Sequence, residues 1–262
     1  MTVLLVDKKG GVARVTLDRP EVRNAFDDAL IASLKKAFLE IEKDQDIRVL
    51  VLAGNGPAFC AGADLNWMKR MAGYGYEQNL ADAQALADML ATLDRMPIPT
   101  IARVHGPAFA GGTGLVAACD IAVGTPEAKF CFSEAKLGLS PATISPHVMR
   151  AIGERAARRY FLTAEVFDAA EAERIGLLTL KVEKEFLDKT IGDLLDHLLS
   201  GGPQAHREIK ALIRSVSGRP VDDALVAETA KRIAEIRVSP EGREGIASFL
   251  EKRKAAWCSK KS

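Results

Sequence analysis

The sequence predicts an α/β fold followed by a helical extension. Over residues 1–183, short apolar runs typical of buried strands alternate with segments whose apolar residues recur at helical spacing. From residue 184 onward, only helical patterns remain. With 262 residues, of which 48% are hydrophobic, the chain can bury a sizeable core. We therefore expect an α/β core over 1–183 and a helical region over 184–262.

Strands are predicted where apolar or alternating runs end at turn residues. These runs lie at 3–6, 12–17, 49–53, 99–104, 121–124 and 129–132. A hairpin turn at 8–11, containing Gly10 and Gly11, separates the first two. The run at 49–53 is apolar throughout, which indicates a strand buried on both faces.

Helices are predicted where apolar residues recur three or four positions apart. Within 28–44, this spacing is shown by Leu30, Leu34, Phe38 and Ile41. Further core helices are expected at 79–95 and 112–119. In the C-terminal region, the expected helices are 187–199, 204–216, 221–238 and 241–256, separated by Gly201-Gly202-Pro203 and Gly218-Arg219-Pro220.

Composition and charge argue against several classes of protein. The chain has 36 basic and 35 acidic residues, so its net charge of +1 gives no reason to expect nucleic acid or a membrane as partner. The four cysteines lack CxxC spacing and the four histidines lack metal-ligand spacing, so we expect no metal site. The first residues do not resemble a signal or transit peptide, and no run of 18 apolar residues could span a bilayer. We therefore expect a soluble, cytoplasmic protein.

Two small-residue turns each follow a predicted buried strand and lead into a helical pattern. They are Phe59-Cys60-Ala61-Gly62-Ala63-Asp64 and Ala110-Gly111-Gly112-Thr113-Gly114. Because the first amides of a helix have no partner within it, two such turns can aim N–H groups at one point. An oxyanion hole forms in this way without charged side chains. Taken alone, each glycine pair more often marks a tight turn or close helix packing, and the second lacks the GxGxxG spacing of a dinucleotide site.

Glu134 follows the apolar segment at 129–132. A lone carboxylate in this position is most often solvated at the end of a strand. Its neighbours Phe130, Cys131 and Phe132 instead suggest partial burial, which would raise its pKa and suit it to acid–base catalysis. A polarised carbonyl and one acid–base carboxylate are sufficient for chemistry beside a thioester.

Further motifs accompany these turns: Leu17-Asp18-Arg19-Pro20, Arg23-Asn24-Ala25, Cys119-Asp120-Ile121-Ala122, Phe132-Ser133-Glu134 and Leu137-Gly138-Leu139. With these motifs, the chain resembles the crotonase (enoyl-CoA hydratase/isomerase) superfamily over nearly its whole length. Within it, four segments resemble the bacterial methylglutaconyl-CoA hydratase group: 64–68, 144–146, 153–160 and 249–253.

The resemblance implies a spiral of strand–strand–helix units with a C-terminal helical region that builds trimers, two of which commonly stack into a hexamer. It places the oxyanion donors on the amides of Ala63 and Gly111 and a catalytic carboxylate at Glu134. It also implies that an acyl-CoA is the substrate and that no other cofactor is needed. The residues that it implies for CoA binding are Arg23, Ala25, Ala61, Asp64, Leu65, Phe249 and Lys252. The last two would border the adenosine 3′-phosphate region of a neighbouring subunit.

Gly114 departs from the superfamily pattern, because ordinary hydratases carry a second catalytic glutamate there. Three interpretations stay open: a hydratase in which Glu134 works with water, an isomerase with Glu134 as sole base, and a non-catalytic acyl-CoA-binding protein. The methylglutaconyl-CoA group shares a non-acidic residue here, which favours hydration of a branched or carboxylated 2-enoyl-CoA, as in fatty acid metabolism or leucine degradation.

There is a physical reason for glycine at position 114. A second carboxylate about 5 Å from a carboxylated substrate would repel it by roughly 3 kcal/mol at an effective dielectric near 20. A missing side chain would also open space beside the substrate.

Trp67, Lys69 and Arg70 follow the first turn. They form either the basic face of an amphipathic helix or a pocket wall with an anchor for a substrate carboxylate. His147 could line the acyl pocket, although a structural role is more usual for an isolated histidine.

Overall fold

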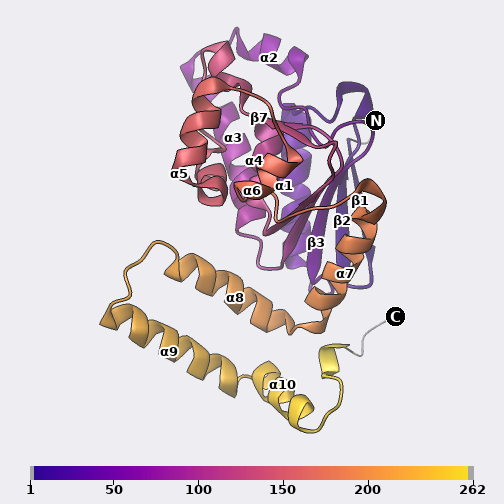
Figure 1. The fold of residues 1–262 in the computed structure, drawn as a ribbon, viewed down its shortest axis with the longest axis vertical. Helices are drawn as coiled ribbons and strands as arrows, with labels where there is room; N and C mark the ends of the chain where they lie inside the picture. The colour runs from indigo at the N-terminus through magenta and orange to yellow at the C-terminus, as the bar shows by residue number, and fades with distance from the viewer. Residues whose placement is uncertain (1–2, 259–262) are drawn as a thin grey trace.

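The computed structural model describes residues 3–258 and contains two sheets, a covering of helices and a helical arm (Figure 1). The larger sheet has the strand order β1-β2-β3-β4-β6-β9. Its strands are β1 (Leu4–Lys9), β2 (Val12–Leu17), β3 (Val49–Gly54), β4 (Thr100–Val104), β6 (Ile121–Gly124) and β9 (Leu180–Lys181). The smaller sheet contains β5 (Ala108–Phe109), β7 (Lys129–Cys131) and β8 (Phe167–Asp168). This mixed architecture confirms the predicted α/β class.

The direction of each strand follows from its connection. β1 and β2 are antiparallel because the tight turn at Gly10 and Gly11 joins them directly. From β2 onward, the neighbours in the larger sheet run parallel, so helix-containing crossovers connect them. The parallel strands therefore end at one edge of the sheet, where the two glycine turns follow β3 and β4.

The central strand β3 is buried on both faces, as its sequence predicts. Leu50 and Leu52 belong to the main core, whereas Val49 and Val51 pack in a second cluster on the opposite face. The main core is covered by α1 (Asp28–Lys43), α3 (Tyr76–Asp94), α4 (Gly111–Ala118) and α5 (Ser145–Thr163). Two short helices, α2 (Leu65–Met71) and α6 (Ala169–Arg174), complete the core.

The second cluster is closed by α7 (Leu187–Ser200), whose Leu187 and Ile191 are buried against the sheet. The predicted boundary between the core and the helical region, at residues 183/184, therefore lies before α7, which still covers the sheet. The helices that do not cover the sheet begin after α7.

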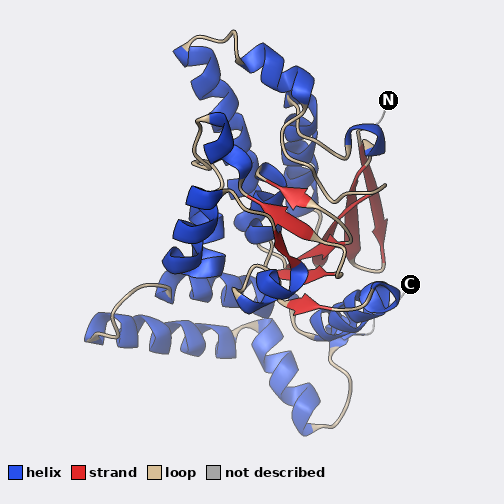
Figure 2. Cartoon of the chain, turned by 45° about the horizontal axis from the view of Figure 1, so that its top comes forward, coloured by secondary structure: helices blue, strands red, loops and turns tan. Residues whose placement is uncertain are grey.

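Beyond α7, the chain forms the helical arm: α8 (Pro203–Val216), α9 (Asp223–Val238) and α10 (Pro240–Leu250). The arm contains helices and loops without strands and lies at the far end of the molecule from α2 (Figures 1 and 2). The predicted helix at 241–256 is too long: α10 ends at Leu250, Lys252 has a φ of 54°, and Arg253 is drawn back to Glu244 by an ion pair of 2.6 Å. Across residues 3–258, no helix combines the length and apolar character needed to cross a membrane.

Candidate active site

The first glycine turn is held by a short segment that precedes α1. The amide of Ala61 donates to the Arg23 carbonyl at 3.0 Å, and the amide of Phe26 donates to the Gly62 carbonyl at 2.6 Å. The Asp64 amide then donates to the Phe26 carbonyl at 2.8 Å. The segment 23–26 and the turn 61–64 therefore run side by side like two parallel strands.

This pairing leaves the amide of Ala63 available. Phe26 and Ala63 form a parallel bridge in which the bonds are made by the residues on either side of Ala63. The N–H of Ala63 consequently points away from Phe26, and none of the hydrogen bonds among residues 3–258 uses it. Gly62 has a φ of 92°, a backbone conformation that residues other than glycine rarely adopt.

A buried polar cluster supports the first turn from behind. The Arg19 guanidinium contacts Asp27 at 2.9 Å and Asp64 at 3.0 Å, and it donates to the Ala25 carbonyl at 2.7 Å. The fully buried Asn24 accepts from the Arg19 amide and donates to two carbonyls of the 55–58 loop. These bonds fix the segment that carries Arg23 and Ala25.

The Asp64 side chain is also committed to the structure. Burial acts to raise the pKa of Asp64, but hydrogen bonds from the amides of Asn66 and Trp67 and the contact with Arg19 outweigh it, so the pKa is lowered. Asp64 thereby caps α2 with its side chain, while its amide donates to Phe26 and its carbonyl accepts from the amide of Met68 at 2.9 Å.

The second glycine turn has a strained entry. Ala110, at the N-cap of α4, has φ 46° and ψ −117°, a conformation that costs a non-glycine residue about 1–3 kcal/mol. Gly111 is the first residue of α4, so its amide has no intrahelical partner, and none of the hydrogen bonds among the described residues uses it. Strained backbone that exposes a free amide is typical of a functional site.

The two turns are in direct contact. The Phe109 amide donates to the Cys60 carbonyl at 2.9 Å, and a β-carbon at Gly112 would clash with that same carbonyl. A β-carbon at Gly111 would lie 2.8 Å from the ring of Phe26, whose backbone pairs with Ala63. Phe26 therefore contacts both turns and brings the two free amides to one region, although the sequence analysis did not single it out.

Glu134 is carried by a one-turn 3₁₀ helix, Ser133–Leu137, directly after β7. β7 pairs with β5, and the amide of Ala110 in the second turn donates to the carbonyl of Cys131 at 2.8 Å. Glu134 follows Cys131 by three residues, so it lies near the second turn. Its Oε2 is buried and has no hydrogen-bond partner in the described part of the chain. Burial raises the pKa of Glu134 above its ordinary value of 4.5, with a smaller opposing effect of its own amide.

The space beside Gly114 is filled, contrary to the expectation that glycine opens it. A β-carbon there would lie 2.5 Å from Cγ2 of Ile144 and 3.6 Å from Cδ1 of Leu90. Ile144 and Leu90 are almost completely buried. The sequence gives no sign of this contact, because the three residues belong to segments far apart along the chain.

The residues expected to bind CoA fall into two groups. Arg23, Ala25, Ala61, Asp64 and Leu65 gather at the first turn, where Arg23 and Leu65 are exposed to solvent. Phe249 and Lys252 are also exposed, but they lie on the arm, at the opposite end of the same chain (Figure 1).

The residues after the first turn differ in exposure. Trp67 is buried, whereas Lys69 and Arg70 are exposed, and Arg70 forms an ion pair of 2.7 Å with Asp28 at the surface. His147 is buried with its Nδ1 3.8 Å from Asp94, away from solvent.

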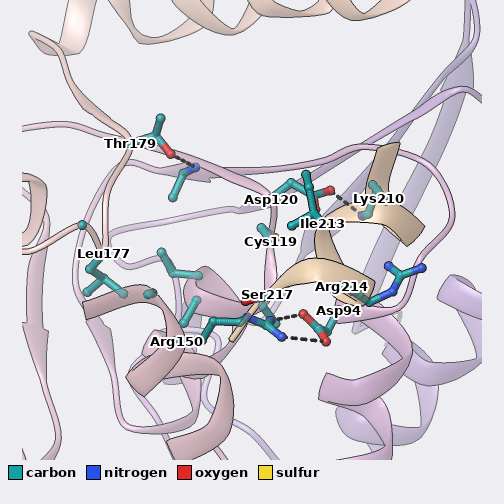
Figure 3. A pocket seen from close by; sticks show the side chains of 16 residues that line it. Asp94, Cys119, Asp120, Arg150, Leu177, Thr179, Lys210, Ile213, Arg214 and Ser217 are labelled. Atoms are coloured by element: carbon teal, nitrogen blue, oxygen red, sulfur yellow. Dashed lines mark hydrogen bonds and ion pairs between the residues drawn. The ribbon is translucent and has the colours of Figure 1, made fainter. Parts of the chain in front are cut away.

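A cavity of about 700 Å³ opens at the other end of α4, between the core and α8 (Figure 3). Asp120, Cys119 and Arg150 line it on the core side, and Lys210 and Arg214 on α8. Because α4 begins at the free amide of Gly111 and ends at this cavity, the two regions are separated by the length of the helix.

Comparison with known proteins agrees with this geometry. The family model for enoyl-CoA hydratase/isomerase matches residues 7–260. The enoyl-CoA hydratase EchA19 of Mycobacterium tuberculosis is 34% identical over 95% of this chain and 94% of its own length. A crystal structure of an enoyl-CoA hydratase from Shewanella pealeana has a TM-score of 0.95 and 44% identity, covering 98% of this chain and 96% of that one. Pseudomonas aeruginosa AtuE has a TM-score of 0.94 and 34% identity, covering 98% and 100%.

The matches span nearly all of both chains at 34–44% identity, and the structural agreement includes the core and the arm. The chain therefore belongs to the enoyl-CoA hydratase/isomerase family of enzymes, within the crotonase superfamily.

Proposed function

We propose that this enzyme hydrates a 2-enoyl-CoA thioester, using two backbone amides and one carboxylate. The observation that carries the proposal is the buried, unpartnered Oε2 of Glu134, which follows the strand bonded to the second turn. A buried carboxylate without a partner is unfavourable for folding, and such groups are typical of catalytic sites.

In the proposed reaction, the thioester oxygen accepts hydrogen bonds from the amides of Ala63 and Gly111. These bonds stabilise the negative charge that develops on this oxygen when water attacks C3. The Glu134 carboxylate takes a proton from the attacking water, and the resulting carboxylic acid returns a proton to C2. Water is thus added across the double bond without oxidation or reduction. The raised pKa of Glu134 suits both halves of this proton transfer.

For the substrate, we propose a branched or carboxylated acyl group such as 3-methylglutaconyl-CoA. The subgroup-like motifs at 64–68 and 144–146 and the absence of an acid at Gly114 support this assignment. Arg23, Ala25, Ala61, Asp64 and Leu65 would contact the CoA moiety of the same subunit. Phe249 and Lys252 would reach the adenosine end in a neighbouring subunit, in a homotrimer or a dimer of trimers.

A second candidate is isomerisation, in which Glu134 moves a proton between two carbons of the acyl chain. Gly114 favours this alternative, because a single base suffices for it. The two reactions differ in whether water is incorporated.

An absorbance assay at the enoyl-thioester band tests the proposal over a panel containing crotonyl-CoA, 3-methylglutaconyl-CoA and a 3-enoyl-CoA. We expect the band to decrease with the 2-enoyl esters and the 3-enoyl ester to remain unchanged. An increase of the band with the 3-enoyl ester alone would identify an isomerase.

A further inference from the structure

We propose that Ile144 is a specificity-determining residue, which excludes a side chain from position 114 and forms an apolar wall beside the reacting carbons. The steric part rests on the structure, and the substrate part rests on the proposed function. Gly114 lies one helical turn along α4 from Gly111, so it is next to the proposed oxyanion donor. A β-carbon at 114 would be 2.5 Å from Ile144 Cγ2 and 3.0 Å from Ile144 Cβ.

The position of Ile144 is well determined by its surroundings. Ile144 is the N-cap residue of α5, is 1% exposed, and is separated from Glu134 by only nine residues. Its carbonyl is held in place because it accepts from the amides of His147 and Val148 in the first turn of α5. Because the side chain is buried in close-packed surroundings and its backbone begins α5, it cannot make room for a β-carbon at 114 without displacing its neighbours.

The groups beside Gly114 are apolar. Leu90, on α3, is fully buried and lies 3.6 Å from the position of the missing β-carbon, next to Ile144. A carboxylate introduced at this point would have to displace Ile144 and would be buried beside aliphatic side chains. Position 114 is thus closed to a second carboxylate, and the side chains that fill the space beside it are aliphatic.

Such a wall matches an alkyl substituent on the substrate. A methyl branch at C3 would gain contact with Ile144, whereas hydrogen at C3 would leave a gap. One methyl group in an apolar pocket changes kcat/KM by about 10- to 200-fold. The matched pair of substrates is 3-methylglutaconyl-CoA and glutaconyl-CoA, which differ only in this methyl group.

The steric part is tested by a double-mutant cycle with Gly114→Ala and Ile144→Gly. Glycine is well tolerated at an N-cap, so Ile144→Gly removes both close contacts without losing the helix start. We expect Gly114→Ala to lower the Tm by about 4 °C or more in the wild-type background and not at all in the Ile144→Gly background. The control is Gly192→Ala in α7, where a β-carbon meets nothing within 4 Å, and which should leave the Tm unchanged or raise it.

The specificity part is tested with the same Ile144→Gly variant. We expect wild type to prefer 3-methylglutaconyl-CoA over glutaconyl-CoA by at least tenfold in kcat/KM, and the variant to reduce this ratio to about one. An unchanged ratio overturns the specificity role, and an equal loss of Tm for Gly114→Ala in both backgrounds overturns the steric one. If wild type hydrates neither ester, the proposed substrate fails, while the Tm cycle still decides the steric claim.

Discussion

The Glu134 carboxyl is buried, and its Oε2 has no hydrogen-bond partner among residues 3–258, so its ionisation affects the stability of the fold. A carboxyl whose pKa is raised in the folded state stabilises the fold only when protonated, so its contribution is present below pH 4.5 and is lost as pH rises through the raised value. Glu134→Gln should therefore match wild type near pH 4 and have the higher Tm at pH 8. Thermal unfolding over this pH range measures the difference.

Glu171→Gln serves as a control of opposite sign. The pKa of Glu171 is lowered to about 2, first by the hydrogen bond from Arg174 and then by that from Tyr160. This carboxylate stabilises the fold above pH 4.5, and the stabilisation is lost as pH falls toward 2. Glu171→Gln should thus be less stable than wild type at pH 8, with the difference shrinking in acid. A Glu134→Gln variant that follows the same trend would show that Glu134 is not destabilised by burial.

The surroundings of Gly114 could not be predicted from the sequence. The sequence shows that the second glutamate is missing, and charge repulsion from a carboxylated substrate would favour glycine there. Contact with Ile144, however, depends on how α4 and α5 pack, which no local pattern records. Gly114→Glu consequently cannot test charge repulsion alone, because the new side chain would first displace Ile144.

At the scale of elements, the sequence predicts well those strands and helices whose pattern depends on residues close together in the chain. The strands 12–17 and 121–124 match β2 and β6, and α1 ends one residue before the predicted bound. These elements are defined by burial of an apolar face, which the sequence displays directly. The helix predicted to end at 256 stops earlier, because its end is set by the ion pair between Arg253 and Glu244. The bridge between Phe26 and Ala63 has no sequence signal either, since it joins loops.

A buried lysine on α8, Lys210, contributes to tying the arm to the core. Lys210 is 8% exposed and pairs with Asp120 (Figure 3). It also donates to the Ile98 carbonyl at 3.0 Å. Asp120 in turn accepts from the amide and hydroxyl of Thr100 at 2.8 and 2.9 Å. This network gives a structural role to Asp120 of the Cys119-Asp120-Ile121-Ala122 motif.

Replacing this lysine should loosen the attachment of α8. Lys210→Met is expected to lower the free energy of unfolding by about 1.5 kcal/mol, near the lower limit for charged hydrogen bonds, because the Asp120 side chain is 34% exposed. Denaturant unfolding at fixed protein concentration measures this value. Lys189→Met, which breaks an exposed pair with Asp193 in α7, should cost no more than about 0.5 kcal/mol. Equal effects for the two variants would contradict the anchoring role of Lys210.

For the whole molecule, the arm exposes more apolar surface than an isolated chain would be expected to carry. Large apolar side chains that are at least half exposed include Ile213, Val226, Val238, Ile246, Phe249 and Leu250. We predict that sister subunits cover these faces in a trimer or hexamer. Light scattering at micromolar concentration should give three or six times the chain mass of 28.2 kDa. A mass of one chain would exclude the proposal that Phe249 and Lys252 reach a neighbouring site.

The central claim is that Glu134 adds water to an enoyl thioester. It is tested most directly by incubation with 3-methylglutaconyl-CoA or crotonyl-CoA in ¹⁸O-labelled water, followed by mass spectrometry of the product. We expect wild type to form a product heavier than the substrate by one labelled water, and Glu134→Gln to form it about 100- to 10,000-fold more slowly. A product with the mass of the substrate and a shifted double bond, or equal rates for the two proteins, would contradict the account.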